Sequence, residues 1–287
     1  MTKPTDIRIL VGLDLSGMDR ELIRYLGILQ QWLPSSHITF LHSIKVAELP
    51  ADMREPAKLR LIASRIESKI RQLISSIAIP DIPFDVQVAH EAYAELAFME
   101  VVKKQQANLV LLGNKQTLEG SGGISQKLAR MLPAAVMLLP ESADRRPRTI
   151  VQAVDFSRYT APVARWGRII AEGEASPRMI PVYIHRMSYH SFPIFSEDET
   201  EAAFRQEAAD KTRKWAAQYR DAPPLQVIPA REQSVASTLM RFARENQADF
   251  IILGVQGVTS LTNLFMGSVA NEVLQRDNAP GLLLVKP

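Results

Sequence analysis

The sequence predicts an α/β protein made of two tandem copies of one domain, each a parallel β-sheet with helices on both faces. Three observations support this prediction: an internal repeat, a strict alternation of strand-like and helix-like segments, and strands that are apolar along almost their whole length. Strands of a parallel sheet are buried on both faces, so they lack the apolar–polar alternation of half-exposed strands. Right-handed crossovers between such strands place helices on the two faces of each sheet.

The internal repeat appears when the sequence is shifted by 141 positions. At this offset Asp14 falls on Asp155 and Gly113 on Gly254. The same offset pairs Ser16 with Ser157, Arg24 with Arg165, Val86 with Val227, Ala89 with Ala230, Ala107 with Ala248 and Leu112 with Leu253. The register therefore holds over roughly a hundred residues without net insertion. We expect two domains, 1–143 and 144–287, joined within the Pro-containing segment 140–147.

Each half is expected to contain five strands separated by helices. The expected strands are 7–13, 38–43, 84–89, 109–112 and 135–139 in the first half, and 149–154, 179–184, 225–230, 250–253 and 282–285 in the second. Helices are expected over about 20–32 and 161–171, after the first strand of each half. Apolar residues at steps of three or four predict two further helices in each half. Their apolar positions are Ile62, Ile66, Ile70, Leu73 and Ile77, then Ala94, Phe98 and Val101, and in the second half Phe204, Ala208, Trp215 and Tyr219, then Val235, Leu239 and Phe242.

Composition narrows the class of protein. With 287 residues, 46% hydrophobic and 23% charged, the chain is long enough for two ordinary globular domains. Cysteine is absent, which excludes disulfides and thiol chemistry and fits a cytoplasmic protein. We see no signal peptide and no apolar run long enough to span a membrane, so we expect no membrane association. The net charge is only +3, and the basic residues Arg145, Arg146 and Arg148 lie in the expected linker, so we expect no nucleic-acid partner.

The stretch with the clearest functional signal follows the strand expected at 250–253. Gly254 ends that strand, Gly257 follows after two intervening residues, and Gly267 and Ser268 stand after nine more, before a helix-like segment. Glycines let the backbone come close to a ligand, and unpaired N–H groups at a helix start favour anions. The pattern is neither G-x-G-x-x-G nor G-x4-G-K-[ST]. It predicts a phosphate-binding loop, although a plain strand–loop–helix connection whose glycines only form turns would look the same.

The spacing G-x2-G-x9-G-S resembles the nucleotide-binding motif of the universal stress protein family, and Val269 and Ala270 continue it as in that family. The resemblance covers essentially the whole chain, in the tandem form of the family. It implies Rossmann-like, doubly wound sheets with strand order 3-2-1-4-5, packed as a pseudo-two-fold dimer within the chain. It also implies ATP, ADP or AMP as ligand, with any Mg²⁺ held mainly by the phosphates. The ligand-binding positions that it implies are Ala153, Val154, Asp155, Ile184, Leu253, Gly254, Gly257, Gly267, Ser268, Val269 and Ala270.

The predicted topology agrees with this ligand site. In doubly wound sheets, ligands bind where the strand order reverses, which here lies between the ends of the first and fourth strands. Asp155 ends the first strand of the second half, and Gly254 ends the fourth. The resemblance implies that Asp155 contacts the adenosine and that the strand end near Ile184 lines the base. Asp155 could instead only cap the next helix, a task that Ser157 could share.

Departures from the family pattern distinguish the two halves. In the second half, Val258, Ser260 and Asn263 stand where the family often has basic residues or glycine, so we expect a loop that relies on backbone donors and binds triphosphate weakly. In the first half, Asp14 and Gly113 are kept, but Gln116 replaces the second glycine. The loop there is several residues shorter and contains Gly120, Ser121, Gly122 and Gly123. We expect a mainly structural role for the first half.

Other sequence features give little evidence of catalysis. The five histidines show no metal-ligand spacing, Ser268 has no evident base, and we expect no catalytic residues and at most a slow ATPase. His185 could touch a ligand but is more simply a strand-end histidine, and the segment 186–195 could be a flap, a partner contact or an ordinary loop. The favoured function is a nucleotide-binding regulatory module of a stress response with an unknown protein partner. The alternative is a nucleotide-independent stress scaffold. Association of two chains into a homodimer is left open.

Overall fold

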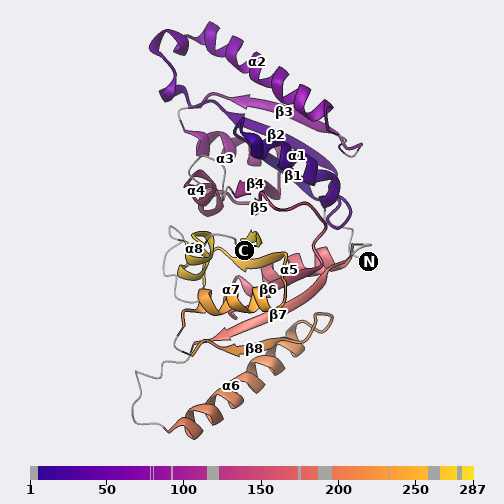
Figure 1. Cartoon of the computed structure of the whole chain (residues 1–287), viewed down its shortest axis with the longest axis vertical. Helices are drawn as coiled ribbons and strands as arrows, with labels where there is room; N and C mark the ends of the chain where they lie inside the picture. Colours follow the sequence, from indigo (N-terminus) through magenta and orange to yellow (C-terminus); the bar gives the residue numbers. More distant parts are fainter. Residues whose placement is uncertain are drawn as a thin grey trace. The chain divides into compact units, whose positions relative to one another are not determined.

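The computed structural model describes residues 6–77, 79, 81–91, 93–114, 123–173, 176–186, 196–231, 233–257, 266–276 and 280–287 (Figure 1). The chain forms two compact units. The first comprises Met1–Arg146, Gly173–Ala175 and Gly281–Leu284, and the second comprises Pro147–Glu172, Ser176–Pro280 and Val285–Pro287. The main division falls at Arg146 and Pro147, within the Pro-containing segment expected to join the repeats.

The first unit contains the strands of the first repeat in the predicted order β3-β2-β1-β4-β5. Its elements are β1 (Arg8–Leu13), α1 (Gly17–Leu29), β2 (His37–Ser43), η1 (Val46–Glu48), η2 (Ala51–Arg54), α2 (Pro56–Ser75), β3 (Phe84–Ala89), α3 (Ala94–Gln105), β4 (Leu109–Asn114), α4 (Gly123–Met131) and β5 (Ala135–Pro140). These five strands pair in parallel. Residues 281–284, the larger part of β10 (Gly281–Val285), complete this unit and pair with β5 in the antiparallel direction, Leu282 opposite Leu138.

The second unit repeats this arrangement, with β8-β7-β6-β9 as parallel neighbours. Its elements are β6 (Thr149–Ala153), α5 (Thr160–Ala171), β7 (Arg178–His185), α6 (Glu197–Gln218), β8 (Gln226–Pro229), α7 (Val235–Glu245), β9 (Phe250–Gly254) and α8 (Ser268–Leu274). The carbonyl oxygen of Val285, the last residue of β10, accepts the N–H of Val255 just after β9 (3.1 Å). The α/β class, the parallel sheets and the predicted strand order are thus confirmed. The pseudo-two-fold packing of the units stays a prediction.

Helices cover both faces of each sheet, so the strands are buried on both sides. Apolar segments of the sequence therefore form the strands. All six residues of β5 are buried, and Leu10, Val11, Leu109 and Val110 are completely inaccessible to solvent. In Figure 1 the long helices α2 and α6 lie beside the edge strands β3 and β8 of their units. Helix α1 begins three residues before the expected Arg20, because the side chain of Ser16 accepts the N–H of Met18 and caps the helix there. The sequence pattern did not predict the 3-10 turns η1 and η2.

The repeat is visible in local geometry as well as in sequence. Leu15 and Phe156, which correspond at the offset of 141, both adopt a left-handed φ, of 63° and 57°. Gln106 and Gln247 do the same after the ends of α3 and α7, with φ of 52° and 51°. Such a φ is uncommon for residues other than glycine. Its recurrence at equivalent positions shows that the two units share turns as well as strand order.

Candidate functional site

The candidate site of the second unit lies at the carboxyl ends of β6 and β9, which are parallel neighbours. Asp155 follows β6 closely, and Gly254 is the last residue of β9. A Cβ placed on Gly257 would lie 3.1 Å from Oδ2 of Asp155. The structure therefore brings the acidic residue of the first strand and the second glycine of the loop together, although about a hundred positions separate them in sequence.

The two oxygens of Asp155 have different surroundings. Oδ1 accepts the backbone N–H of Ser157 (2.9 Å) and the hydroxyl of Thr160 (3.2 Å), so it stabilises the turn before α5. Oδ2 faces Gly257, and among the described residues no donor to it is seen. The capping role and the ligand role are thus compatible, because each uses a different oxygen. A carboxylate oxygen at this edge can accept hydrogen bonds from a ligand hydroxyl or amine.

The three glycines of the motif serve different purposes, and none of them adopts a left-handed φ. A Cβ on Gly254 would lie 2.5 Å from Cβ of Tyr159 and 2.9 Å from the carbonyl oxygen of Gln256, so packing alone requires glycine there. A Cβ on Gly267 would lie 3.1 Å from Cα of Gln256 and 3.2 Å from N of Gly257. Among the described residues, only the Asp155 carboxylate limits the space at Gly257, which makes Gly257 the glycine of the three with the weakest structural explanation.

The two ends of the loop meet through the backbone. The N–H of Gly267 donates to the carbonyl oxygen of Val255 (2.8 Å). The absence of a Cβ on Gly267 permits this close approach. The nine residues between Gly257 and Gly267 include Val258, Ser260 and Asn263, and all except Met266 lie outside the described residues.

Gln256, between the first two glycines, is a site residue that was not predicted from the sequence. It is 5% exposed, and its Oε1 accepts the hydroxyl of Tyr159 (2.8 Å) and Nη2 of Arg158 (2.9 Å). These contacts join the loop after β9 to the turn after β6. They also bring the Arg158 guanidinium to the start of the loop, and the expectation that the loop relies on backbone donors stays a prediction. In the sequence, only its position within the G-x2-G spacing could have marked Gln256 as a candidate site residue.

Aromatic and basic side chains gather beside this edge, on β7, α6 and the turn after β6. The rings of Phe156 and Tyr183 pack edge to face, with centroids 5.6 Å apart. Nζ of Lys211 lies 4.9 Å from the Phe156 centroid, and Nζ of Lys214 lies 5.2 Å from it. Cations at this distance from a ring are attracted by its π-electrons. This aromatic–lysine cluster was not predicted from the sequence.

Ile184, which was predicted to line the base, lies on one side of β7, and its neighbours Tyr183 and His185 lie on the other. Ile184 is buried, at 8% exposure, whereas His185 Nδ1 lies 3.2 Å from Glu207 on α6. The hydroxyl of Tyr183 donates to the same carboxylate (3.4 Å). Burial, followed by the charge of Glu207, raises the pKa of Tyr183 to about 12. His185 is thus engaged with Glu207, and residues 187–195 of the possible flap lie outside the described part of the chain.

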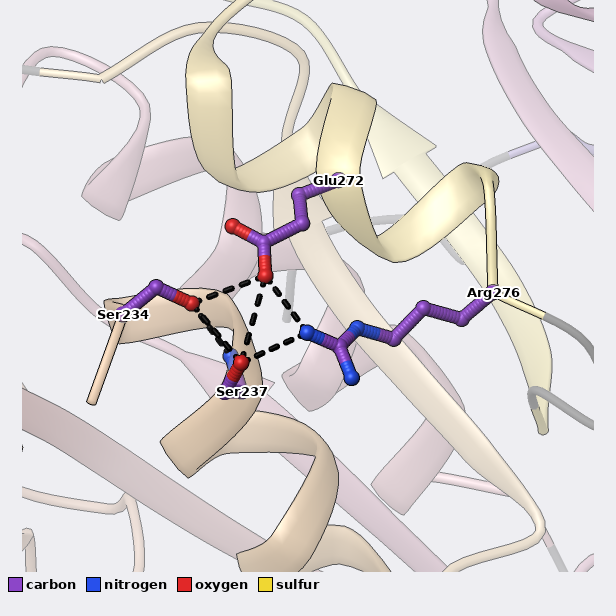
Figure 2. A network of polar contacts seen from close by, with 4 residues as sticks. All are labelled: Ser234, Ser237, Glu272 and Arg276. Atoms are coloured by element: carbon purple, nitrogen blue, oxygen red, sulfur yellow. Dashed lines mark hydrogen bonds and ion pairs between the residues drawn. The ribbon is translucent and has the colours of Figure 1, made fainter.

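Helix α8 begins at Ser268 and has only seven residues, with Gly267 as its N-cap residue. Ser268 is exposed, Val269 is half-buried and Ala270 is buried. A helix this short is held mainly by its neighbours. Figure 2 shows the polar cluster that holds it: Ser234, Ser237, Glu272 and Arg276.

The carboxylate of Glu272 is the centre of this polar cluster. Its Oε1 accepts the hydroxyls of Ser234 (2.8 Å) and Ser237 (3.2 Å), which lie at the start of α7, and forms an ion pair with Arg276. The hydrogen bond from Arg276 is the largest cause of the lowered pKa of Glu272. The cluster therefore ties α8, and the loop end before it, to α7.

The remaining predicted positions lie in or next to the strands. Ala153 ends β6, and the next residue, Val154, is buried, as is Leu253 in β9. The side chains of Val154 and Leu253 belong to the core, so a ligand could meet only their backbone. Within the described ranges, no group of three or more His, Asp or Glu residues is arranged to hold a metal ion. No helix in those ranges is long and apolar enough to cross a membrane.

The equivalent edge of the first unit is built from different side chains. A Cβ on Gly113 would collide with Cγ of Met18, the residue equivalent to Tyr159. Asp14 accepts the N–H of Ser16 (3.2 Å) in the same turn that Asp155 forms. Asp19 replaces Thr160, and its two oxygens accept the N–H groups of Asp14 (3.0 Å) and Leu15 (2.8 Å). Residues 115–122, with Gln116, Gly120, Ser121 and Gly122, lie outside the described residues; Gly123 begins α4.

Comparison with known proteins agrees with the fold and with the second repeat. Residues 147–284 match the sequence family described as the universal stress protein family. A universal stress protein of Methanocaldococcus jannaschii, MJ0531, is 33% identical over 85 residues, which are 29% of this chain and 46% of that protein. The alignment thus spans about half the length of this relative.

Two solved structures share the fold along almost the whole chain. A putative universal stress protein from Pseudomonas aeruginosa UCBPP-PA14 superposes with a TM-score of 0.61 at 18% identity, covering 99% of this chain and 94% of that one. A universal stress protein from Archaeoglobus fulgidus DSM 4304 gives a TM-score of 0.63 at 14% identity, covering 97% and 98%. At these identities the likeness concerns the fold.

Proposed function

We propose that this chain, which belongs to the universal stress protein family, is an adenine-nucleotide-binding regulatory module that binds ATP, ADP or AMP in its second unit. The observation that carries the proposal is the juxtaposition of Asp155 Oδ2 with Gly257 at the point where the strand order reverses. This edge is where doubly wound sheets bind their ligands.

Each part of the ligand has a partner of suitable chemistry. Oδ2 of Asp155 can accept a hydrogen bond from a ribose hydroxyl or from the adenine amine. The backbone at Gly257 and Gly267 can approach a phosphate because no side chain stands in the way. Arg158, held at the loop through Gln256, adds a positive charge that favours an anionic ligand (2.9 Å from its Nη2 to Oε1 of Gln256).

We propose little or no hydrolysis. Fast phosphoryl transfer needs a positioned base or water and metal ions that neutralise the developing charge. In the described part of the site, Asp155 Oδ1 is engaged in a turn, and His185 Nδ1 lies 3.2 Å from Glu207. No group of carboxylates there is arranged to bind a metal. Any Mg²⁺ would be held mainly by the phosphates of the nucleotide. A change in the bound nucleotide would then alter the surface that this chain offers to a protein partner. We propose that it does so in the cytoplasm.

The test separates the ligand role of Gly257 from the packing role of Gly254. A nucleotide that binds only the folded state raises the thermal midpoint by mass action, so we expect a rise with ATP, ADP or AMP for the parent chain. Gly257→Ala should leave the midpoint of the free protein nearly unchanged, because the one described group that its methyl group meets is the Asp155 carboxylate. It should nevertheless weaken binding by at least about tenfold, because the methyl group would lie 3.1 Å from Asp155 Oδ2 and obstruct the ligand's approach to that oxygen.

Gly254→Ala is the matched control. Its methyl group would collide with Tyr159 and with the backbone of Gln256, so we expect a lower midpoint of the free protein. If Gly257→Ala binds nucleotide like the parent, Gly257 has no ligand role. If the parent shows no rise at millimolar ATP, ADP or AMP, the proposal is wrong.

A second candidate is a nucleotide-independent scaffold, and the packing at Gly254 and Gly267 favours it. Both glycines have structural reasons that need no ligand. For this candidate, the glycine spacing would serve only to close the loop between β9 and α8. The thermal-shift experiment distinguishes the two candidates, because the scaffold predicts no response to nucleotide in parent or variant.

A further inference from the structure

The first unit contains a cavity of about 720 Å³ at its own strand-order reversal. The carboxyl ends of β1, β2 and β4 form its floor, and α1, α2, α3 and α4 contribute to its walls. This volume lies in the range of pockets that bind small molecules. A mainly structural role, as the sequence predicts for this unit, does not explain such a cavity.

The walls of the cavity are largely apolar, whereas some of the equivalent positions in the second unit carry polar side chains. Ile44, Ile62 and Ile66 line it, together with Phe98 from α3. At the offset of 141, Ile44 corresponds to His185 and Ile66 to Glu207, whose side chains approach to 3.2 Å in the second unit. The first unit therefore presents aliphatic side chains where the second presents a histidine and a carboxylate. An apolar ligand body fits such walls, because burial of its surface is favourable.

Hydrogen-bond acceptors are concentrated at the floor. Nδ1 of His42 lies 3.0 Å from the carbonyl oxygen of Leu13, and because a carbonyl only accepts, Nδ1 carries the proton. Burial lowers the pKa of His42, so the ring is neutral and Nε2 is an acceptor. The carboxylate of Asp14 also lines the cavity, and the buried hydroxyl oxygen of Ser43 has no hydrogen-bond partner among the described residues.

The charges around the cavity oppose an anionic ligand. Asp14, Asp19 and Glu48 line it, against a single basic residue in the described lining, Lys45. Nζ of Lys45 lies 3.1 Å from the carboxylate of Glu48, so these two charges balance each other, and Asp14 and Asp19 leave the described lining net negative. A phosphate or a carboxylate placed here would meet like charges, whereas an amine would meet acceptors and negative charge.

From these observations we infer that the first unit binds an organic amine with an apolar body, with the ammonium group at Asp14 and His42 and the body against Ile62, Ile66 and Phe98. This site differs from the proposed nucleotide site in three ways: it lies in the other unit, its walls are apolar, and its charge favours a cation. The first unit then acts as a separate ligand-binding unit within the same chain.

The experiment uses the full chain and three probes that share a phenyl body: 2-phenylethylamine, 2-phenylethanol and 3-phenylpropanoate. Titrations followed by saturation-transfer NMR should show the amine binding at least about tenfold more tightly than the carboxylate, with the alcohol between them. Asp14→Asn should reduce the affinity for the amine to that for the alcohol. Equal binding of amine and carboxylate overturns the inference.

A filled cavity provides the second test. Ile66 lies half-buried on α2, so Ile66→Trp can place an indole in the cavity while leaving the helix intact, which circular dichroism checks. This variant should lose amine binding. The matched control is Ala203→Trp on α6, an exposed position equivalent to Ile62 at the offset of 141, which should bind the amine like the parent. Amine binding that survives Ile66→Trp, or that is lost equally in Ala203→Trp, overturns the inference.

Competition with ATP keeps this inference distinct from the proposed function. Excess ATP should not displace the amine, because the two ligands occupy different units. Displacement would show that the cavity accepts nucleotide and would overturn the inference. A chain that binds the amine but gives no thermal response to ATP would contradict only the nucleotide proposal.

Discussion

Asp14 and Asp155 occupy equivalent turns, yet their carboxylates have different neighbours. Both accept the N–H two residues later, and both precede a residue with a left-handed φ. Asp155 shares its Oδ1 with the hydroxyl of Thr160, whereas Asp14 lies beside a second carboxylate, Asp19. The first unit thus has the carboxylate of Asp19 where the second has the hydroxyl of Thr160, which adds negative charge at the carboxyl ends of its strands.

Asp19 makes stability depend on pH. Burial, the largest cause, raises the pKa of Asp19 from 3.8 to about 6, although two backbone N–H groups partly oppose the shift. The folded chain therefore binds more protons than the unfolded chain between about pH 4 and pH 6, and the free energy of unfolding falls as pH rises through this window. From pH 4 to pH 7 the loss from this group should reach up to about 3 kcal/mol.

Urea unfolding of the parent and Asp19→Asn at several pH values measures this effect. The asparagine does not titrate, so the parent should lose stability relative to the variant as pH rises from 4 to 7. Asparagine also offers one acceptor in place of two, which lowers the stability of the variant at every pH without changing the slope. Parallel curves for the two proteins would contradict the prediction.

At the scale of elements, α8 is the part of the candidate site that depends most on its neighbours. Seven residues are too few to form a stable helix alone, and the Glu272 cluster connects it to the start of α7 (Figure 2). In contrast, α6 has 22 residues and a capping box in which Ser196 and Glu199 bond to each other's backbone N–H. Helix α6 thus carries its own end signal, whereas α8 relies on side chains from another helix.

Replacing Arg276 tests this dependence. Arg276→Met removes the ion pair and the hydrogen bond to Ser237, and we expect a loss of up to about 1 kcal/mol in urea unfolding, because both partners of the ion pair are more than a third exposed. The control is Arg241→Met, which removes an exposed pair with Glu245 (3.9 Å) on α7 alone and should cost less than about 0.5 kcal/mol. Equal losses in the two variants would argue against a special role of the cluster.

At the scale of the whole molecule, two copies of one fold have different side chains at the carboxyl ends of their strands. The second unit presents Asp155, three loop glycines and a nearby arginine, and the first presents an apolar cavity with acceptors at its floor. Divergence after a duplication would account for the shared turns and the different side chains.

Calorimetry should therefore report one nucleotide per chain. Asp155→Ala removes the carboxylate oxygen that faces Gly257 and should weaken nucleotide binding by on the order of 1–3 kcal/mol, the loss of a charge-assisted hydrogen bond. Asp14→Ala, the matched change in the first unit, should leave the nucleotide affinity nearly unchanged. Two nucleotide sites per chain, or equal effects of the two variants, would contradict this asymmetry.

The repeat, the class of fold and the position of the glycine loop all follow from the amino-acid sequence. Apolar runs specify buried parallel strands, and the period of apolar positions specifies the faces of the helices, because both are local consequences of backbone geometry. The expected strands therefore agree with the observed ones to within two residues at each end. The spacing of Gly254, Gly257 and Gly267 likewise locates the candidate site without knowledge of any contact.

The role of each side chain at the two edges depends instead on tertiary contacts. Folding packs Gly254 against Tyr159, places Gln256 between Tyr159 and Arg158, and turns one oxygen of Asp155 towards Gly257. Folding also gathers residues from four helices and three strands around the cavity of the first unit. These contacts join residues up to about a hundred positions apart, so they follow from how the strands pair and how the helices cover them. Local sequence patterns do not encode such distances.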